Sequence, residues 1–231
     1  MVRGTHSLFD FGPLARHYDG WYETAGGKAH DQQQKAAVIR LLPLPAGNAK
    51  LLDVASGTGH WSGFFASRGF SVTGIDVSRE MVEVANARNT PAGLFAIADA
   101  CRMPFRDGSF DVVAAMAAIE FVSDAQAAVA EMFRCVRRDG AVIIGTLNRL
   151  APLNRERVAD RKKPYSSARL FSPTELRYLL APYGTVHILM ADPEGEVNER
   201  RKTGAFIVAN ASRQGRWHVS MLDTEIHAKE A

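Results

Sequence analysis

The sequence predicts an α/β fold in which helices cover both faces of a doubly wound parallel sheet. Between residues 50 and 148, apolar runs typical of strands alternate with amphipathic runs typical of helices. The strand runs are apolar on both faces, as expected for strands buried on both sides. Because parallel strands joined by helices use right-handed crossovers, this alternation favours a doubly wound sheet.

The elements of this central part are assigned from apolar patterns and capping residues. Strands are predicted at residues 50–55, 71–77, 93–99, 110–118 and 141–147, and helices at 60–68, 79–88 and 124–138. Ser78 can cap the second of these helices, and Ser123 with Gln126 matches a capping box for the third. Gly140 is the expected left-handed residue that closes the third helix.

The flanking segments carry their own signals. An aromatic stretch precedes a helical pattern at residues 31–42, which stops at Pro43 because proline cannot continue a helix. Further on, "SPTE" at residues 172–175 matches another capping box, with Pro173 at the first helical position. We expect a helix at 173–184, strands at 186–191 and 204–210, and a polar tail after Asn210.

The bulk composition excludes several classes of protein. The chain has 231 residues, 46% of them hydrophobic, which is enough for a self-sufficient core. Cys101 and Cys135 lie far apart without metal-ligand spacing, which predicts a reducing, cytoplasmic location and no metal site. We see no secretory signal and no membrane span. A net charge of +3 is too small to indicate nucleic acid as a partner.

The stretch "LLDVASGTGHWSGFF" is the first candidate for a binding site, because it follows the first predicted strand. In an open parallel sheet, ligands bind outside the carboxyl ends of the strands. Gly57 and Gly59 allow a sharp turn whose backbone can lie against a ligand. With Gly63 they also fit a dinucleotide-binding spacing, so glycine spacing alone leaves that alternative open.

Acidic residues near the ends of successive strands narrow the choice of ligand. Asp76, at the end of the second strand, can accept both hydroxyls of a ribose, as in nicotinamide-binding folds too. Asp99, at the end of the third, can accept from the exocyclic amine of adenine. Asp53, just before the glycine turn, adds negative charge where a pyrophosphate would otherwise lie. It therefore suits a cationic amino acid that carries a sulfonium.

At this point the chain resembles the class I S-adenosylmethionine-dependent methyltransferases, and most of all the branch that includes quinone-biosynthesis enzymes. "LLDVASGTGHWSGFFASRGFSVTGIDVSREMVEVA" resembles the first two motifs of the family, and "AIADACRMPFRDGSFDVV" the third-strand and fourth-strand motifs. "EMFRCVRRDGAVIIGTLNR" resembles the fifth-strand motif. The resemblance implies a Rossmann-like, seven-stranded, mostly parallel sheet with an antiparallel last strand.

The resemblance also implies how the single domain, residues 1–231, is divided. The predicted parts are an N-terminal helical cap (1–49), a cofactor-binding half (50–148), a basic acceptor-side insertion (149–171), a C-terminal helix and strands (172–210) and a polar tail (211–231). The implied cofactor is S-adenosylmethionine, with S-adenosylhomocysteine as product. The implied partner is a small-molecule methyl acceptor.

The resemblance also implies roles for the individual residues that match the motifs of the family. Asp53, Ala55, Gly57 and Gly59 would hold the methionine end, although Ala55 stands where the family usually has glycine. Asp76 would bind the ribose. The remaining predicted cofactor-binding residues are Val77 and Met81 at the adenine, Asp99 and Ala100 at its amine edge, Ala117 near the sulfonium, and Tyr18 as part of a cover over the cofactor. Packing of the cover on the sheet is an equal alternative.

The sequence names no compelling catalytic base. The candidates are His17, Tyr22, Glu120 and Tyr165, each of which also has a purely structural interpretation. His60 is interpreted as a surface or helix-capping residue. In the basic insertion, Arg155 and Arg157 could recognise a carboxylate or phosphate on the acceptor, with Tyr165 as an apolar wall. A solvated charged lid is the alternative.

Three other functions stay open at this stage. A nicotinamide-dependent oxidoreductase shares the glycine turn, but it does not account for Asp99 and the motifs downstream. An RNA or other nucleic-acid methyltransferase would be expected to carry an appended basic domain or a tetrad of the N/D-P-P-Y kind after the fourth strand, where this chain has "AAMAAIEFV". The third is a non-catalytic protein that binds S-adenosylmethionine or S-adenosylhomocysteine.

Overall fold

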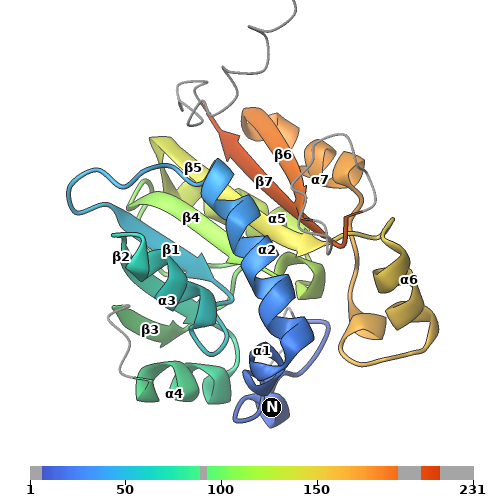
Figure 1. Ribbon diagram of the computed structural model, residues 1–231. Coiled ribbons are helices and arrows are strands. Elements are labelled where there is room, and N and C mark those ends of the chain that lie inside the picture. The colour runs from blue at the N-terminus through green and yellow to red at the C-terminus, as the bar shows by residue number, and fades with distance from the viewer. Residues whose placement is uncertain (1–6, 89–92, 192–203, 214–231) are drawn as a thin grey trace, which may run out of the picture.

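The computed structural model describes residues 7–88, 93–191 and 204–213. A seven-stranded sheet in the order β3-β2-β1-β4-β5-β7-β6 forms its centre (Figure 1). Its strands are β1 (Lys50–Val54), β2 (Ser71–Asp76), β3 (Leu94–Ile97), β4 (Phe110–Met116), β5 (Val136–Leu147), β6 (Thr185–Ala191) and β7 (Phe206–Ser212). β1 to β5 pair in parallel, whereas β7 is antiparallel to both β5 and β6. The predicted fold class is confirmed.

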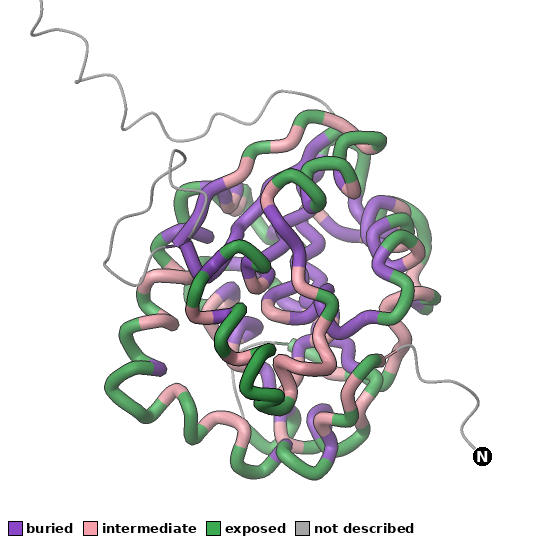
Figure 2. The backbone as a smooth tube through the Cα atoms, turned by 90° about the vertical axis from the view of Figure 1, so that its right-hand side faces the viewer, coloured by how far each residue is buried: buried purple, intermediate pink, exposed green. Residues whose placement is uncertain are grey.

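Helices cover the sheet on both faces. They are α1 (Gly20–Glu23), α2 (Ala25–Leu41), α3 (His60–Ser67), α4 (Arg79–Ala87), α5 (Ala125–Cys135), α6 (Pro152–Ala159) and α7 (Pro173–Leu180). α2 and α3 contribute to one apolar cluster, and α5 and α7 to a second cluster on the other face (Figure 1). Figure 2 shows the buried backbone gathered in the interior, between helices with exposed outer faces.

The sheet has a topological switch point between β1 and β4. The chain proceeds outwards from β1 through β2 to β3, and then returns to β4 on the opposite side of β1. Loops that leave β1 and β4 at their carboxyl ends therefore diverge and leave a crevice between them. This is where the glycine turn after β1 lies.

Two of the predicted caps are confirmed and two are wrong. Ser78 caps α4 by accepting from the Met81 N–H, and Ser172 forms the capping box of α7. The N-cap of α5 is Asp124, not Ser123, because the Asp124 carboxylate accepts from the N–H of Ala127 at 2.9 Å. Gly140 does not close α5, which ends at Cys135.

Gly140 instead lies inside β5, where strand packing requires glycine. A Cβ at this position would lie 2.5 Å from the backbone oxygen of Asp111 and 2.6 Å from a methyl group of Val136. Val136 is buried and pairs with Phe110, so strand pairing begins there rather than at residue 141, and a register shift follows before Ala141 pairs with Val112.

The two ends of the described chain also differ from the predicted boundaries. α2 begins at Ala25, where Thr24 is the N-cap, rather than at residue 31, and it ends before Pro43 as expected. β7 continues to Ser212, so residues 211 and 212 belong to this strand and not to the predicted polar tail. Residues 214–231 of the predicted tail lie outside the described residues. The predicted single domain over the whole chain stays a prediction.

The predicted basic insertion contains α6 and a 3-10 turn at Tyr165–Ser167, and it lies at one side of the molecule (Figure 1). Asn154 ties α6 to the sheet, because its Nδ2 donates to the backbone oxygens of Asn148 and Ala205 at 2.9 and 2.7 Å. Among the described residues, no helix has the length and apolar character needed to cross a membrane.

The packing around Gly140 gives a testable prediction. Gly140→Ala should lower the free energy of unfolding by about 1–3 kcal/mol, because the added methyl group meets backbone that cannot move aside. Gly26→Ala is the control: it lies in α2 with nothing within 4 Å of the added Cβ, and it should stabilise by about 0.5–1 kcal/mol. Urea unfolding measures both variants, and equal effects would contradict the prediction.

Candidate functional site

A cavity of about 580 Å³ opens at the switch point, within the range typical of small-molecule sites. Its walls come from the turn after β1, the carboxyl ends of β2, β3 and β4, and the N-terminal segment. Nine of the eleven predicted cofactor-binding residues line it: Tyr18, Ala55, Gly57, Asp76, Val77, Met81, Asp99, Ala100 and Ala117. Asp53 and Gly59 do not.

Asp76 links the end of β2 to the glycine turn. One carboxylate oxygen accepts from the Gly57 N–H at 2.9 Å and the other from the Ser78 N–H at 2.8 Å. Burial raises the pKa of this carboxyl, and the backbone hydrogen bonds partly offset that effect. Because each carboxylate oxygen has two lone pairs, Asp76 keeps acceptor capacity for a further donor in the cavity.

The turn after β1 depends on residues with positive φ. Gly57 has φ 54° and Gly59, the N-cap of α3, has φ 80°. Ala55 has φ 55°, a left-handed conformation that costs a non-glycine residue about 1 kcal/mol. A Cβ on Gly59 would lie 3.0 Å from the ring of Phe95, so this glycine permits packing against β3.

Asp53 lies beneath the turn, not in the cavity wall. Its side chain is 1% exposed and accepts from the hydroxyl of Ser62 at 2.6 Å. Burial raises the pKa of Asp53 to about 7, although the Ser62 hydrogen bond lowers it and the charge of Asp76 raises it further. Its role at the methionine end stays a prediction.

The third and fourth strands supply the opposite wall. Asp99 follows β3, and its carboxylate accepts from the Cys101 N–H at 2.9 Å. Ala117 follows β4 with φ 51°, and its N–H donates to the Gly145 oxygen at 2.8 Å. Both residues reach the cavity as the sequence predicts, because both follow the carboxyl ends of parallel strands.

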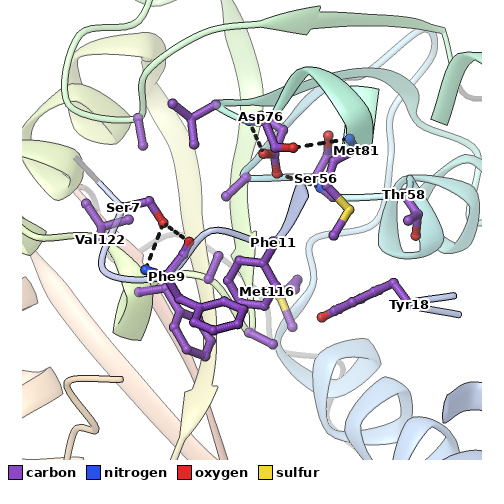
Figure 3. Close-up of a pocket in the computed structure, with 18 of the residues that line it drawn as sticks. Ser7, Phe9, Phe11, Tyr18, Ser56, Thr58, Asp76, Met81, Met116 and Val122 are labelled. Carbon is purple, nitrogen blue, oxygen red and sulfur yellow. Dashed lines mark hydrogen bonds between the residues drawn. The ribbon is translucent and has the colours of Figure 1, made fainter. Parts of the chain in front are cut away.

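The N-terminal segment closes the cavity with aromatic rings that the sequence analysis did not assign to the site. Phe11 contacts Phe121 edge to face at 4.9 Å and Phe9 at 4.7 Å. The Leu8 N–H donates to the Phe121 oxygen and anchors the segment beyond β4. In Figure 3, Phe9, Phe11 and Tyr18 lie around Met116, whereas Asp76, Ser56 and Met81 form a separate group. In the sequence, the aromatic stretch "FDFGPLARHYDGWYE" is the feature that could have indicated this role.

The tyrosines of this cover stay protonated at neutral pH. Burial raises the pKa of Tyr18 to about 12, and the neighbouring Tyr165, Glu120 and Asp76 raise it as well. Burial also raises the pKa of Tyr22, whose ring lies parallel to that of His60 at 3.7 Å.

The four candidates for a catalytic base have different positions. Tyr22 lines the cavity, but His17, Glu120 and Tyr165 do not. Glu120 is fully buried and accepts from the Thr146 hydroxyl at 2.9 Å and the Leu147 N–H at 3.3 Å. Burial raises its pKa to about 7, against the effect of these hydrogen bonds. Glu120 therefore lies behind the cavity wall, in a position that indicates a structural role.

Two polar atoms in the cavity wall indicate that the site suits a polar ligand. Ser56 Oγ and Trp61 Nε1 are buried, line the cavity and have no hydrogen-bond partner among the described residues. Buried polar atoms are almost always satisfied, so a ligand with donors and acceptors fits here. Together with Asp76 and Asp99, they give the cavity wall both hydrogen-bond donors and acceptors.

Comparisons with known proteins agree with this geometry. A family model described as a methyltransferase domain matches residues 52–144. The chain is 34% identical over 134 residues to a demethylmenaquinone methyltransferase of Beutenbergia cavernae, over 58% of this chain and 55% of the relative. It is 33% identical over 98 residues to a malonyl-[acyl-carrier protein] O-methyltransferase of Serratia marcescens, over 42% of this chain and 38% of the relative. The match thus spans about half or less of these curated relatives.

A solved structure extends the likeness to most of the fold. The crystal structure of an S-adenosylmethionine-dependent methyltransferase from Thermotoga maritima superposes with a TM-score of 0.73, at 24% identity, over 88% of this chain and 98% of that chain. The described residues therefore share the Rossmann-like fold of that structure. Residues 52–144 match the sequence model of a methyltransferase domain, and the curated relatives and the solved structure to which the chain is similar are methyltransferases.

The buried carboxyl of Glu120 predicts a pH dependence of stability. Its pKa is raised in the folded protein, so folding takes up a proton, and stability falls as the pH rises from the ordinary glutamate pKa towards about 7. Glu120→Gln should therefore be more stable than the wild type at pH 8, and this advantage should shrink towards pH 5. Thermal unfolding at both pH values measures it, and a pH-independent difference would contradict it.

Proposed function

We propose that this protein transfers the methyl group of S-adenosylmethionine to a small-molecule acceptor by in-line displacement. The observation that carries the proposal is the convergence of Gly57, Asp76 and Asp99 on one cavity at the switch point. Asp76 would bind the ribose hydroxyls and Asp99 the adenine amine. The cofactor supplies a methyl group on a good leaving group, so the residues of this chain mainly align the reactants. Alignment in a closed site can contribute about 7–11 kcal/mol to lowering the barrier.

The aromatic half of the cavity supports a flat or aromatic acceptor. Phe9, Phe11 and Phe121 give it a wall of ring faces and edges next to Ala117, where the methyl group would lie. The two curated relatives named above act, by their names, on demethylmenaquinone and on a malonyl group carried by a protein. An acceptor with a ring or an anionic group would resemble the substrates in the names of these two relatives.

The basic insertion supports recognition of an anionic group. Arg155 is exposed, and the Arg157 guanidinium lies over the ring of Tyr165, 4.6 Å from its centroid. Tyr165 in turn acts electrostatically on Tyr18 and Tyr22 of the cover. The Arg157–Tyr165 pair is therefore near the aromatic side of the site.

Asp76→Asn tests the cofactor site. The amide keeps the size of the side chain but loses its charge and half of its acceptors, so S-adenosylhomocysteine should bind with an affinity lower by about 2 kcal/mol, roughly 30-fold. Titration calorimetry measures the dissociation constant. Asp139→Asn, an exposed carboxylate in β5 outside the cavity, is the matched control and should bind like the wild type.

The same titration separates the competing functions. S-adenosylhomocysteine should give heat of binding and NADH none, whereas the reverse result would favour an oxidoreductase. Transfer of a labelled methyl group to a panel of small hydroxyl, amine and carboxylate acceptors then distinguishes an enzyme from a protein that only binds the cofactor. Transfer to RNA alone would contradict a small-molecule acceptor.

The role of the insertion has its own test. Reversing charge with Arg155→Glu and Arg157→Glu should raise the KM for an anionic acceptor about tenfold or more, with kcat for the bound acceptor little changed. Steady-state kinetics with the acceptor found in the panel measures this. Arg106→Glu, on the loop before β4 and outside the cavity, is the control, and an equal effect in both would contradict a specific role.

A further inference from the structure

A histidine–aspartate pair reaches the cavity from two separate helices. His60 is the first residue of α3, directly after the glycine turn, and its ring lines the cavity. Its Nε2 lies 2.7 Å from Oδ1 of Asp31 in α2, and the two side chains are only 20% and 14% exposed. The contact joins residues 29 positions apart, so the fold and not local sequence creates it.

The surroundings of the pair keep Asp31 ionised and the His60 ring fixed. Burial raises the pKa of Asp31, but the hydrogen bonds from His60 and Lys35 outweigh it and lower that pKa below the ordinary value. Lys35 Nζ lies 2.6 Å from Oδ2 of Asp31 and 3.1 Å from Nε2 of His60. The ring of Tyr22 stacks on the imidazole at 3.7 Å with an interplanar angle of 8°.

This arrangement selects one form of the neutral imidazole. An ionised carboxylate can only accept, and Nε2 lies closer to Asp31, at 2.7 Å, than to the Lys35 ammonium, at 3.1 Å. The shorter contact favours a hydrogen on Nε2 that is donated to Asp31, while Lys35 donates to the other carboxylate oxygen at 2.6 Å. Nδ1 then carries the lone pair, and no group among the described residues binds it. A histidine oriented in this way by a carboxylate has the arrangement required of a general base.

We propose that His60, held by Asp31, is the base that deprotonates a hydroxyl acceptor during methyl transfer. This inference rests on the proposed function and names the reacting group of the acceptor. The acceptor oxygen forms a bond to the methyl carbon while its O–H proton passes to Nδ1 of His60. The carbon–sulfur bond breaks, its electron pair stays on sulfur, and neutral S-adenosylhomocysteine leaves. The imidazolium is stabilised by Asp31 and then loses its proton to water.

Charged and titratable neighbours of His60 come from two elements and one loop. Asp31 and Lys35 face it from α2, and Tyr22 faces it from α1. Asp19 lies close by, because its carboxylate accepts from the hydroxyl of Thr58 at 2.8 Å.

Kinetic measurements on His60→Gln and Asp31→Asn test the proposal. His60→Gln should lower kcat for a hydroxyl acceptor about 10²- to 10⁴-fold at pH 7 and remove the acidic limb of its pH profile, because general-base catalysis is typically of this size. The loss should shrink as the pH approaches the pKa of the acceptor hydroxyl. His30→Gln is the control, since His30 neighbours Asp31 but stacks on Trp21 outside the cavity wall.

Two readouts do not depend on turnover. Calorimetry should show S-adenosylhomocysteine bound by His60→Gln within threefold of the wild type. Nitrogen chemical shifts of the imidazole should report the Nε2–H form in the wild type, lost in Asp31→Asn. A tenfold loss of product binding, an unchanged pH profile, an unchanged imidazole tautomer or transfer to non-hydroxyl acceptors alone would overturn the inference. Failure of the whole panel, with normal product binding, would instead overturn the proposed function.

Discussion

The cavity depends on one interaction, the hydrogen bond between the Asp76 carboxylate and the N–H of Gly57. β1 and β2 lie side by side in parallel, so the turn after β1 and the end of β2 meet at the same edge of the sheet. The carboxylate holds that turn open and positions the start of α3, while its second oxygen holds the start of α4 through Ser78. One acid thus sets the position of two helix N-termini around the site.

The same edge of the sheet concentrates backbone strain. Ala55 and Ala117, at the ends of the two strands that flank the switch point, both have positive φ. Each costs about 1 kcal/mol, and the surrounding strand pairing makes alternative conformations more costly still. Strained positions of this kind cluster where a fold must bring its backbone close to a ligand. Here both residues lie just after β1 and β4 and line the cavity between these strands.

The parts of the site that sequence predicts well are those whose geometry is local. Asp76 ends a strand, and Asp99 and Ala117 each lie just after one, so strand prediction alone brings them to one edge of the sheet. Gly140 shows the limit of this reasoning, because a glycine after a helical run has the same sequence signal whether it ends the helix or packs against a neighbouring strand. Only the close approach of Asp111 distinguishes the two.

The remaining features depend on contacts between distant segments. Phe11 reaches the site by packing on Phe121, and His60 gains its partner from α2, so neither role has a local pattern. His60 in isolation has the sequence signature of a helix-start residue. The contact arises because α2 crosses the same face of the sheet as α3 (Figure 1) and brings the half-buried carboxylate of Asp31 to the His60 ring. The polar residues at the carboxyl ends of the strands can therefore be predicted from the sequence of those strands, whereas the His60–Asp31 contact depends on how the N-terminal helices pack over them.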